Sequence, residues 1–284
     1  MIPLLVYPID FMLDLGIDFD VYRTFHGHAA VFGEITRYRL QALAVSIGFA
    51  VLARLLKAAT LPAALCGGLI CFELADLAVG YPLNLLRSPI PALALLFLLT
   101  SLATRFRRAK KESAGIAEAR TGRRASQVVA NLGILAFLGI LKHFHALELP
   151  YIAAIAALAE ATADTLSSEI GQGLAGPAFL VTSLRRVPPG TDGAVSLTGT
   201  IAGLAGAALV VLIGLPRPFW GLTPLLFAAI FLAATAGLFF DSLLGATLER
   251  RGWIGNDLVN FSSTAFAALA SWPLLLLALK LLRV

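Results

Sequence analysis

The sequence predicts an all-α, polytopic integral membrane protein with about seven to eight transmembrane helices. Of its 284 residues, 58% are hydrophobic and 14% are charged, whereas soluble domains contain about 45–50% apolar and about 25% charged residues. The apolar runs consist mainly of Ala, Leu and Gly and lack the period-two alternation of membrane strands, so strands are not expected. This composition excludes a soluble globular enzyme and a disordered chain.

The net charge and the two cysteines exclude further classes of protein and of site. A formal net charge of +5, in a chain whose apolar surface must face lipid, argues against a nucleic-acid partner. Cys66 and Cys71 lie in one apolar run, which excludes a disulfide scaffold and a four-ligand zinc site. The first basic residue is Arg23, so no positively charged leader is present and no signal peptide is expected.

Eight apolar runs are candidate membrane spans, because a helix crosses the bilayer with about 20 mostly apolar residues. In chain order they cover residues 40–56, 61–80, 90–104, 126–141, 149–166, 195–213, 222–244 and 258–282. The fourth run is short and begins with polar residues. We expect residues 40–284 to form a single transmembrane helical domain.

Residues 1–39 are expected to form a separate N-terminal segment. Asp10, Asp14 and Asp18 are spaced four residues apart, which favours a short helix lying at the membrane interface. A lead-in without regular structure explains the same residues equally well. The sequence leaves open whether this segment crosses the membrane.

The distribution of basic residues predicts the orientation, because cytoplasmic loops are enriched in Lys and Arg. The connection 105–125 carries eight of the 22 basic residues, and we place it in the cytoplasm. Alternation of the spans puts three more connections on that side, around Arg54 and Lys57, at 167–194 and at 245–257. The last two, with 105–125, carry most of the motifs considered next.

Polar side chains gather at the cytoplasmic ends of four predicted spans. A charged residue near the bilayer centre costs about 2.5–3.5 kcal/mol, so such residues usually mark function. Because these residues come from four spans and share one depth, they predict a single polar site, with unrelated helix ends as the alternative. Several oxygen ligands from different helices suit Mg²⁺. The residues are Gln127, Asn131, Asp164, Ser168, Glu169, Asp241, Asn256, Asp257 and Asn260.

Three further acidic residues inside predicted spans are secondary candidates. Glu160 precedes Asp164 by four residues and therefore shares its helix face. Glu73 and Asp76 could form a proton relay, pair with a basic residue such as Arg54, or reach into the shared cavity. The sequence does not choose between these three roles.

The loop at residues 182–193 predicts a phosphate-binding turn. Its prolines and glycines force turns, and turns leave backbone N–H groups free to bind anions. A tight loop with cytoplasmic arginines is the alternative. The candidate binding residues in and beside this loop are Arg185, Arg186, Gly190, Thr191 and Ser196.

Two segments resemble each other weakly. Both 163–169 and 240–249 place an Asp and a hydroxyl residue at the end of a span, followed by an acidic residue. Such an echo is typical of a membrane fold built from internal repeats.

Four blocks of the sequence resemble the phytyl-phosphate kinase family of polytopic membrane proteins. They are KKESAGIAEAR at 110–120 with GRRASQVVAN at 122–131, ADTLSSEIG at 163–171, LVTSLRRVPPGTDGAVSLTGT at 180–200, and DSLLGATLE at 241–249 with NDLVN at 256–260. The resemblance implies transfer of a phosphoryl group from a nucleoside triphosphate, CTP in plant members, to an isoprenyl monophosphate such as phytyl or geranylgeranyl phosphate. The product is the isoprenyl diphosphate.

The chain departs from this family at two places. Residues 171–177 lack a lysine that many relatives carry, so we expect Arg185 or Arg186 to replace it. The insertion between Glu249 and Asn256 is short compared with that of animal relatives. Both departures leave the choice of nucleotide open, with CTP favoured.

The resemblance and the residues together suggest a mechanism. We expect Asp164, Glu169, Asp241 and Asp257 to be catalytic and to hold one or two Mg²⁺ at the donor phosphates. The acceptor is already a phosphate with a second pKa of about 6, so it needs no strong general base. The expected nucleotide- and phosphate-binding residues are Lys111, Arg123, Arg124, Gln127, Asn131, Ser168, Arg185, Arg186, Gly190, Thr191, Ser196, Asn256 and Asn260.

Two other functions stay open. A CTP-dependent isoprenoid-alcohol kinase of the phytol or dolichol type would need a base, which Asp164 or Asp241 could supply. A secondary transporter would be built on Glu73 and Asp76. We expect the protein to lie in a bacterial-type inner membrane or an organelle envelope, with its site facing the cytoplasm. The expected partners are the lipid bilayer, a nucleoside triphosphate and an isoprenyl monophosphate. A homodimer, the isoprenoid chain length and the pathway served, such as tocopherol or quinone salvage, are left open.

Overall fold

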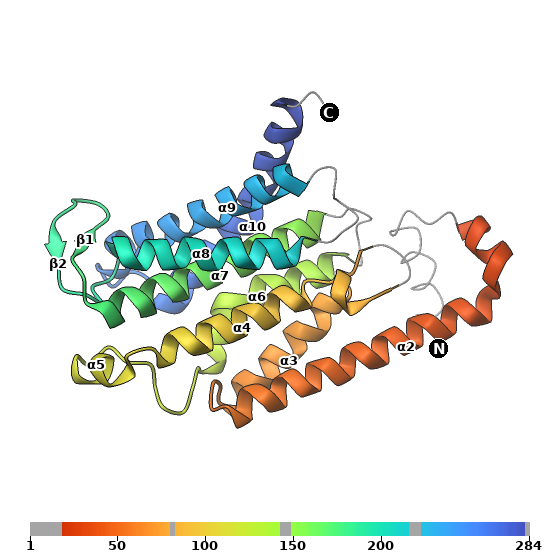
Figure 1. Cartoon of the computed structure of the whole chain (residues 1–284), viewed down its shortest axis with the longest axis horizontal. Coiled ribbons are helices and arrows are strands. Elements are labelled where there is room, and N and C mark those ends of the chain that lie inside the picture. Colours follow the sequence, from red (N-terminus) through yellow and green to blue (C-terminus); the bar gives the residue numbers. More distant parts are fainter. Residues whose placement is uncertain (1–18, 80–82, 143–148, 216–222, 282–284) are drawn as a thin grey trace.

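The computed structural model describes residues 19–79, 83–142, 149–215 and 223–281. Each of the eight predicted spans is a helix in this part of the chain, which confirms the all-α class (Figure 1). The eight long helices are α2 Phe19–Leu55, α3 Leu61–Ala75, α4 Ile90–Arg105, α6 Ala125–Lys142, α7 Leu149–Leu174, α8 Leu197–Gly214, α9 Thr223–Leu244 and α10 Asn256–Leu281.

Five of these helices contain segments long and apolar enough to cross a membrane. The segments are Gly33–Leu55, Ala125–Lys142, Leu197–Gly214, Pro224–Glu249 and Asn256–Leu277. Helices α3 and α4 are apolar but shorter. Large apolar side chains such as Leu69 and Leu212 are exposed on the outside of the bundle, as lipid-facing residues of a membrane protein would be.

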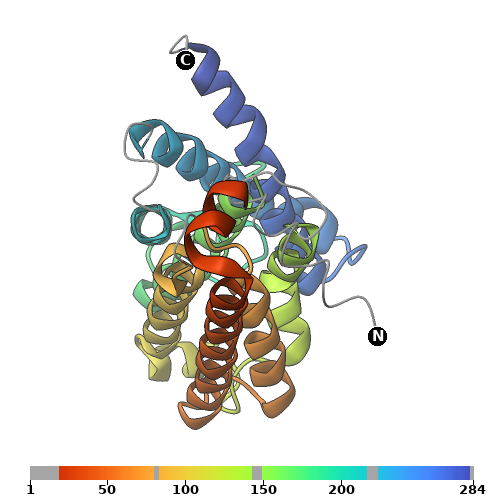
Figure 2. The same ribbon diagram turned by 90° about the vertical axis from the view of Figure 1, so that its right-hand side faces the viewer.

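Helix α7 lies at the centre of the bundle and packs against α4, α6, α8, α9 and α10 (Figures 1 and 2). Its residues Ala154 to Ala159 are completely buried, so this helix faces protein on all sides rather than lipid. Helix α8 approaches α7 so closely at Gly206 that a Cβ atom there would lie 2.6 Å from Leu166 Cδ2. Small residues at such positions are typical of helix contacts in membranes.

Helix α2 crosses residue 40 without a break. No change of secondary structure therefore marks the boundary that we placed between residues 1–39 and 40–284. The expected interfacial helix around Asp10, Asp14 and Asp18 lies outside the described residues.

Short elements connect the long helices. They are the 3₁₀ helix η1 Leu85–Arg87, helix α5 Arg108–Ser113, strands β1 Ala178–Leu180, β2 Arg186–Val187 and β3 Ala194–Ser196, and the π-helix η3 Gly245–Glu249. The strands form an antiparallel sheet in the order β2-β1-β3, with Ala178 opposite both Val187 and Ser196. The expectation of no strands concerned the apolar runs, and the long helices confirm it; the three short strands lie in the connection between α7 and α8, where only residues 195–196 of β3 overlap a predicted run. The prolines and glycines of this connection favour chain reversal.

The loops that we placed in the cytoplasm meet at one end of the bundle, at the left in Figure 1. Ala59 and Arg123 form a parallel β-bridge between the loop after α2 and the loop before α6. A Cβ atom at Gly190 would lie 3.1 Å from Ile116 Cγ2, so the loop between β2 and β3 contacts the connection 105–125 as well. The polar ends of the helices are thereby enclosed beneath these loops.

Candidate functional site

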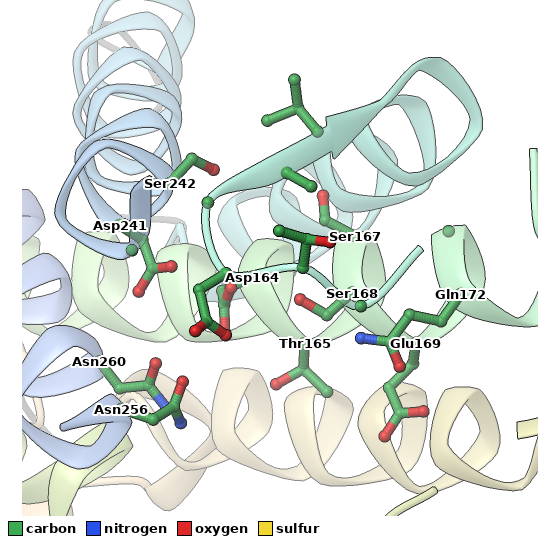
Figure 3. Close-up of a pocket in the computed structure, with 18 of the residues that line it drawn as sticks. Asp164, Thr165, Ser167, Ser168, Glu169, Gln172, Asp241, Ser242, Asn256 and Asn260 are labelled. Atoms are coloured by element: carbon green, nitrogen blue, oxygen red, sulfur yellow. The ribbon is translucent and has the colours of Figure 1, made fainter. Parts of the chain in front are cut away.

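A cavity of about 390 Å³ lies at this end of the bundle, among α6, α7, α9, α10 and the sheet (Figure 3). Its lining is mostly polar and comes from segments more than 100 residues apart in the sequence. Convergence of polar groups from several helices is typical of binding sites in helical bundles.

Asp164 of α7 and Asp241 of α9 form the acidic centre of this cavity. Figure 3 shows their carboxylates pointing into the same space. Ser263 of α10 donates a hydrogen bond to Asp241 Oδ2 at 3.2 Å, which helps to fix that side chain. Glu160, one helical turn before Asp164, is fully buried and lies against Gly237. Glu160 thus packs between α7 and α9 one turn away from Asp164 and does not line the cavity.

Amide side chains from two helices complete the same end of the cavity. Asn256 and Asn260, one turn apart at the start of α10, lie beside the two aspartates in Figure 3.

Asn131 of α6 donates to Gln127 O at 2.9 Å. Gln127 accepts a hydrogen bond from Arg124 N at 2.7 Å and donates to Glu118 at 3.4 Å. Gln127 therefore caps α6 and also orders the preceding loop.

Arg123 brings a positive charge to the cavity wall. Its Nη2 donates to Thr165 Oγ1 at 3.2 Å. Its backbone is fixed on both sides, because its N–H donates to Ala58 O at 2.9 Å and its carbonyl accepts from Thr60 N at 3.0 Å. The guanidinium is thus held against α7 by a rigid backbone connection.

Charge in the lining is strongly unbalanced. Among the described lining residues, Arg123 is the one basic side chain, against six carboxylates. The six are Glu118, Asp164, Glu169, Asp192, Asp241 and Glu249. An anionic ligand would be repelled from such a cavity unless cations accompany it.

Glu169 lies at the other end of the cavity, beside Gln172, and not with the two aspartates (Figure 3). It forms an ion pair with Lys111 of α5. The Lys111 side chain is 1% exposed, and its Nζ also donates to Ala103 O at 3.2 Å and to Thr104 O at 2.9 Å. Lys111, expected to bind phosphate, does not line the cavity and instead anchors Glu169 from behind.

The loop between β2 and β3 covers the cavity with Gly190, Thr191 and Gly193. Thr191 Oγ1 donates to Pro188 O at 2.7 Å, which closes the turn. Ser196 Oγ accepts from Gly199 N at 3.1 Å and caps α8. Gly193 has a φ of +70° and packs against the backbone of Ala246. The loop is therefore held directly on η3, the π-helix that follows α9.

The structure brings together most of the residues expected at the site. Those that line the cavity are Arg123, Gln127, Asn131, Asp164, Ser168, Glu169, Gly190, Thr191, Ser196, Asp241, Asn256 and Asn260. Glu160 is adjacent, as described above.

The other expected residues lie elsewhere. Asp257 follows Asn256 by one residue and so lies about 100° around the helix, outside the lining. Arg124, Arg185 and Arg186 are exposed to solvent and do not line the cavity, because the β1–β2 hairpin carries the last two away from it.

Glu73 and Asp76 lie at the opposite end of α3 from the loop that contacts Arg123. Asp76 pairs there with Arg39 at 3.2 Å, not with Arg54. They therefore do not reach into the shared cavity.

Sequence reasoning missed several lining residues, namely Glu118, Thr165, Ser167, Gln172, Asp192, Ser242 and Glu249. Gln172 follows Ser168 by four residues and therefore lies on the same helix face as Glu160, Asp164 and Ser168, so this spacing could have predicted it. Ser242 and Glu249 belong to the weakly repeated segment. Glu118 has no such signal, since only the folded loop brings it to Gln127.

The donor set is compatible with Mg²⁺. No group of three or more His, Cys, Asp or Glu side chains that could hold a metal occurs among the described residues. Mg²⁺, however, is usually held by one or two carboxylates together with substrate phosphates. Asp164 and Asp241, with the amide oxygens of Asn256 and Asn260, provide that number and kind of ligand.

Comparison with known proteins identifies the family. The family described as integral membrane protein DUF92 matches residues 44–268. The chain belongs to the DUF92 family. This match includes every residue that lines the cavity. No solved structure matches the chain.

Three curated proteins are similar to this DUF92 chain. An uncharacterized membrane protein of Synechocystis, sll0875, is 34% identical over 61% of the chain and 68% of its own length. Protein VTE6, chloroplastic, of Arabidopsis thaliana is 31% identical over 62% of the chain. The match covers 55% of VTE6, so the chain spans about half of that relative. The uncharacterized membrane protein MJ0933 of Methanocaldococcus jannaschii is 36% identical over 59% of the chain and 68% of its own length.

Proposed function

We propose that this DUF92 protein is a membrane kinase that transfers a phosphoryl group from a nucleoside triphosphate, CTP in the favoured case, to an isoprenyl monophosphate. The observation that carries the proposal is the acidic centre formed by Asp164 and Asp241, with Arg123 held in the wall of the same cavity. All four sequence blocks that resemble the phytyl-phosphate kinase family contribute residues to this cavity. Similarity to VTE6 of Arabidopsis is compatible with the proposal.

The balance of charge supports a metal-dependent phosphoryl transfer. Even with Glu169 paired to Lys111, five other carboxylates and one guanidinium line the cavity, so a nucleoside triphosphate would be repelled as a bare anion. Asp164 and Asp241 would hold Mg²⁺, assisted by Asn256 and Asn260. When bound, the metal neutralises negative charge on the donor phosphates.

The remaining groups would position the reactants. Arg123 would neutralise charge on the transferred phosphoryl group, because its guanidinium is fixed at the cavity wall. Backbone N–H groups of the 190–193 turn would bind a donor phosphate. Phosphoryl transfer depends mainly on such positioning and charge stabilisation.

The reaction needs no strong base. An oxygen of the acceptor phosphate, already ionised near pH 7, would attack the γ-phosphorus. The bond between the γ-phosphorus and the β,γ-bridging oxygen would break, and the nucleoside diphosphate would leave. The products are the isoprenyl diphosphate and the nucleoside diphosphate.

The test is an endpoint assay on detergent-purified protein with CTP, Mg²⁺ and geranylgeranyl monophosphate. We expect geranylgeranyl diphosphate with metal and none without it. Phytol in place of the monophosphate tests the alcohol-kinase alternative, in which Asp164 or Asp241 would act as the base. Phosphorylation of phytol alone, or no product with any nucleotide, would overturn the proposal.

A further inference from the structure

A second cavity of about 350 Å³ lies beside the acidic one, among α2, α3, α4 and α6. Its interior is mainly apolar and is lined by Phe49, Leu93, Leu96, Phe97 and Leu132, with the hydroxyl residues Thr100, Ser101 and Thr104 along α4. The rings of Phe49 and Phe97 meet edge to face with centroids 5.2 Å apart. The cavity is within the range of about 300–1,000 Å³ that small-molecule sites occupy.

The mouth of this second cavity is basic, in contrast to the first. Lys57, Arg105, Arg108, Arg120 and Arg123 line it, and Glu118 is the one acidic side chain among its described lining residues. Two of these cations donate to backbone carbonyls: Arg105 Nη2 to Leu56 O at 2.8 Å, and Arg108 Nη2 to Glu118 O at 2.8 Å. Arg108 and Arg120 also pair with Glu112 at 3.0 Å, so the positive charge at the mouth is carried mainly by Lys57, Arg105 and Arg123.

The two cavities meet at Arg123. Arg123, Asn131 and Glu118 line both of them. The guanidinium of Arg123 is held there by Thr165 Oγ1. A ligand that lay in the apolar cavity with an anionic head at its mouth would therefore present that head to the acidic centre.

We infer that the second cavity binds the apolar tail of the acceptor lipid and that its basic mouth places the single phosphate headgroup at Arg123. The identity of the occupant, an isoprenyl monophosphate, rests on the proposed function. Phe49, Phe97 and the leucine side chains give the interior a mainly apolar wall that suits a long hydrocarbon chain better than a nucleotide base and ribose, although Thr100, Ser101 and Thr104 also line the cavity. Each part of the occupant matches one part of the cavity: the tail matches the apolar walls, and the anionic head matches the basic mouth.

The same cavity would set the chain length. Its lining follows α4 from Arg105 to Leu93, which is about 18 Å at 1.5 Å per residue. Gly67 of α3 lies in the wall, and a Cβ atom there would lie 3.4 Å from Phe49 Cε1. A larger side chain at Gly67 would therefore project into the space that the tail occupies.

The test compares Gly67→Leu with Gly48→Leu. Gly48 is a matched control, because it is a glycine of α2 that does not line the cavity, and a Cβ atom there would meet nothing within 4 Å. The probe is geranylgeranyl monophosphate with a diazirine on its last isoprene unit, photolysed with protein in nanodiscs without nucleotide. We expect labelled peptides from α2 and α4, and at least about tenfold less labelling in Gly67→Leu. Gly48→Leu should label as the wild type does.

Three results would overturn the inference. Labelling confined to α9 and α10 would place the tail elsewhere. Equal labelling of Gly67→Leu and wild type would show that the cavity is not occupied. Competition by geranylgeraniol as strong as that by unlabelled geranylgeranyl monophosphate would remove the role of the basic mouth.

A second variant keeps the test valid if Gly67→Leu fails to fold. Phe97→Ala enlarges the same cavity, and we expect it to shift preference towards longer isoprenyl monophosphates. Unchanged chain-length preference would count against the inference. The labelling needs no turnover, so its failure differs from failure of the proposed function. If the probe is bound but no diphosphate forms, only the kinase proposal is rejected. If diphosphate forms at the same rate and with the same chain-length preference in both variants and in the wild type, only the tail site is rejected.

Discussion

Lys111 and Glu169 form an ion pair that joins helix α5 to the central helix α7 directly behind the acidic cavity. Lys111 is almost completely buried, and Glu169 reaches the lining. The lysine also binds two backbone carbonyls at the end of α4. One side chain thus fixes three elements around the site, although it does not itself face the ligand.

Loss of this pair is expected to destabilise the protein. Lys111→Met leaves Glu169 without its cation, and breaking a buried pair costs about 3–5 kcal/mol. Unfolding followed in mixed detergent micelles measures this change. Lys111→Met/Glu169→Gln, which removes both charges, should recover part of the lost stability. Equal stability of the single variant and the wild type would contradict the structural role.

The close contact between the covering loop and the π-helix η3 gives a second prediction. Gly193→Ala introduces a Cβ atom into the backbone of Ala246 at a φ of +70°. The loop must then move off the cavity, and we expect kcat/KM for the nucleotide to fall at least about tenfold, a loss of about 1.4 kcal/mol.

Gly252→Ala is the control for that variant. Gly252 also has a φ of +70°, but a Cβ atom there would meet nothing within 4 Å. It carries only the backbone cost of about 1–2 kcal/mol for a non-glycine residue. Similar losses of kcat/KM in the two variants would show that the contact with Ala246 has no functional effect.

The position of Arg123 is expected to depend on Gly122. At a φ of +83°, a Cβ atom at Gly122 would lie 2.5 Å from Ala58 C and 2.6 Å from Ala59 N. Gly122→Ala should therefore separate the two loops and displace the guanidinium. We expect a rise in KM for the isoprenyl monophosphate, measured by initial rates.

Gly115→Ala separates strain from displacement. Gly115 has a φ of +71° in the same connection, with open space around it. It should leave the KM for the acceptor near that of the wild type. A rise in KM equal to that of Gly122→Ala would contradict the role of the Arg123 backbone.

Removal of the divalent metal should abolish both turnover and nucleotide binding. The reason is the excess of carboxylates in the lining. Equilibrium dialysis of labelled CTP, with Mg²⁺ or with a chelator, measures the binding. Tight binding of CTP in the presence of the chelator would contradict this view of the cavity.

Catalysis is expected to be independent of the opposite end of the bundle. Asp76→Asn weakens a pair with Arg39 in which Asp76 is 6% exposed and Arg39 is 43% exposed, so the loss of stability should lie between the values for exposed and buried pairs, about 1–3 kcal/mol. Diphosphate formation should stay near that of the wild type. Loss of turnover with intact folding would instead favour a function that runs through this end of the protein.

Much of this architecture could be predicted because apolar runs and loop charges are local signals. The run at 61–80 contains α3, the run at 90–104 ends one residue before α4 does, and the positively charged loops do meet at one end. Convergence of Asp164 and Asp241 followed from their shared depth. The continuation of α2 through residue 40 was missed, since that stretch is too polar to stand out as a span.

Some residues could not be assigned to the cavity from the sequence, because tertiary contacts determine whether they line it. Lys111 and Arg185 are both basic loop residues in the sequence, yet one is buried against Glu169 and the other is exposed on a hairpin. Asn256 and Asp257 are adjacent, and only the rotation of α10 puts the first in the lining. The apolar cavity has no signal at all, because its wall residues look like ordinary span residues.

The most direct test of the central claim is the single-turnover rate of Asp164→Asn and Asp241→Asn. Purified wild type and variants would be mixed with labelled CTP, Mg²⁺ and geranylgeranyl monophosphate, and diphosphate would be followed by rapid quench. Because the two carboxylates would hold the metal at the reacting phosphates, each variant should lose at least about 100-fold in rate while remaining folded. Near-wild-type rates in both folded variants would contradict the assignment of the acidic cavity as the site of phosphoryl transfer.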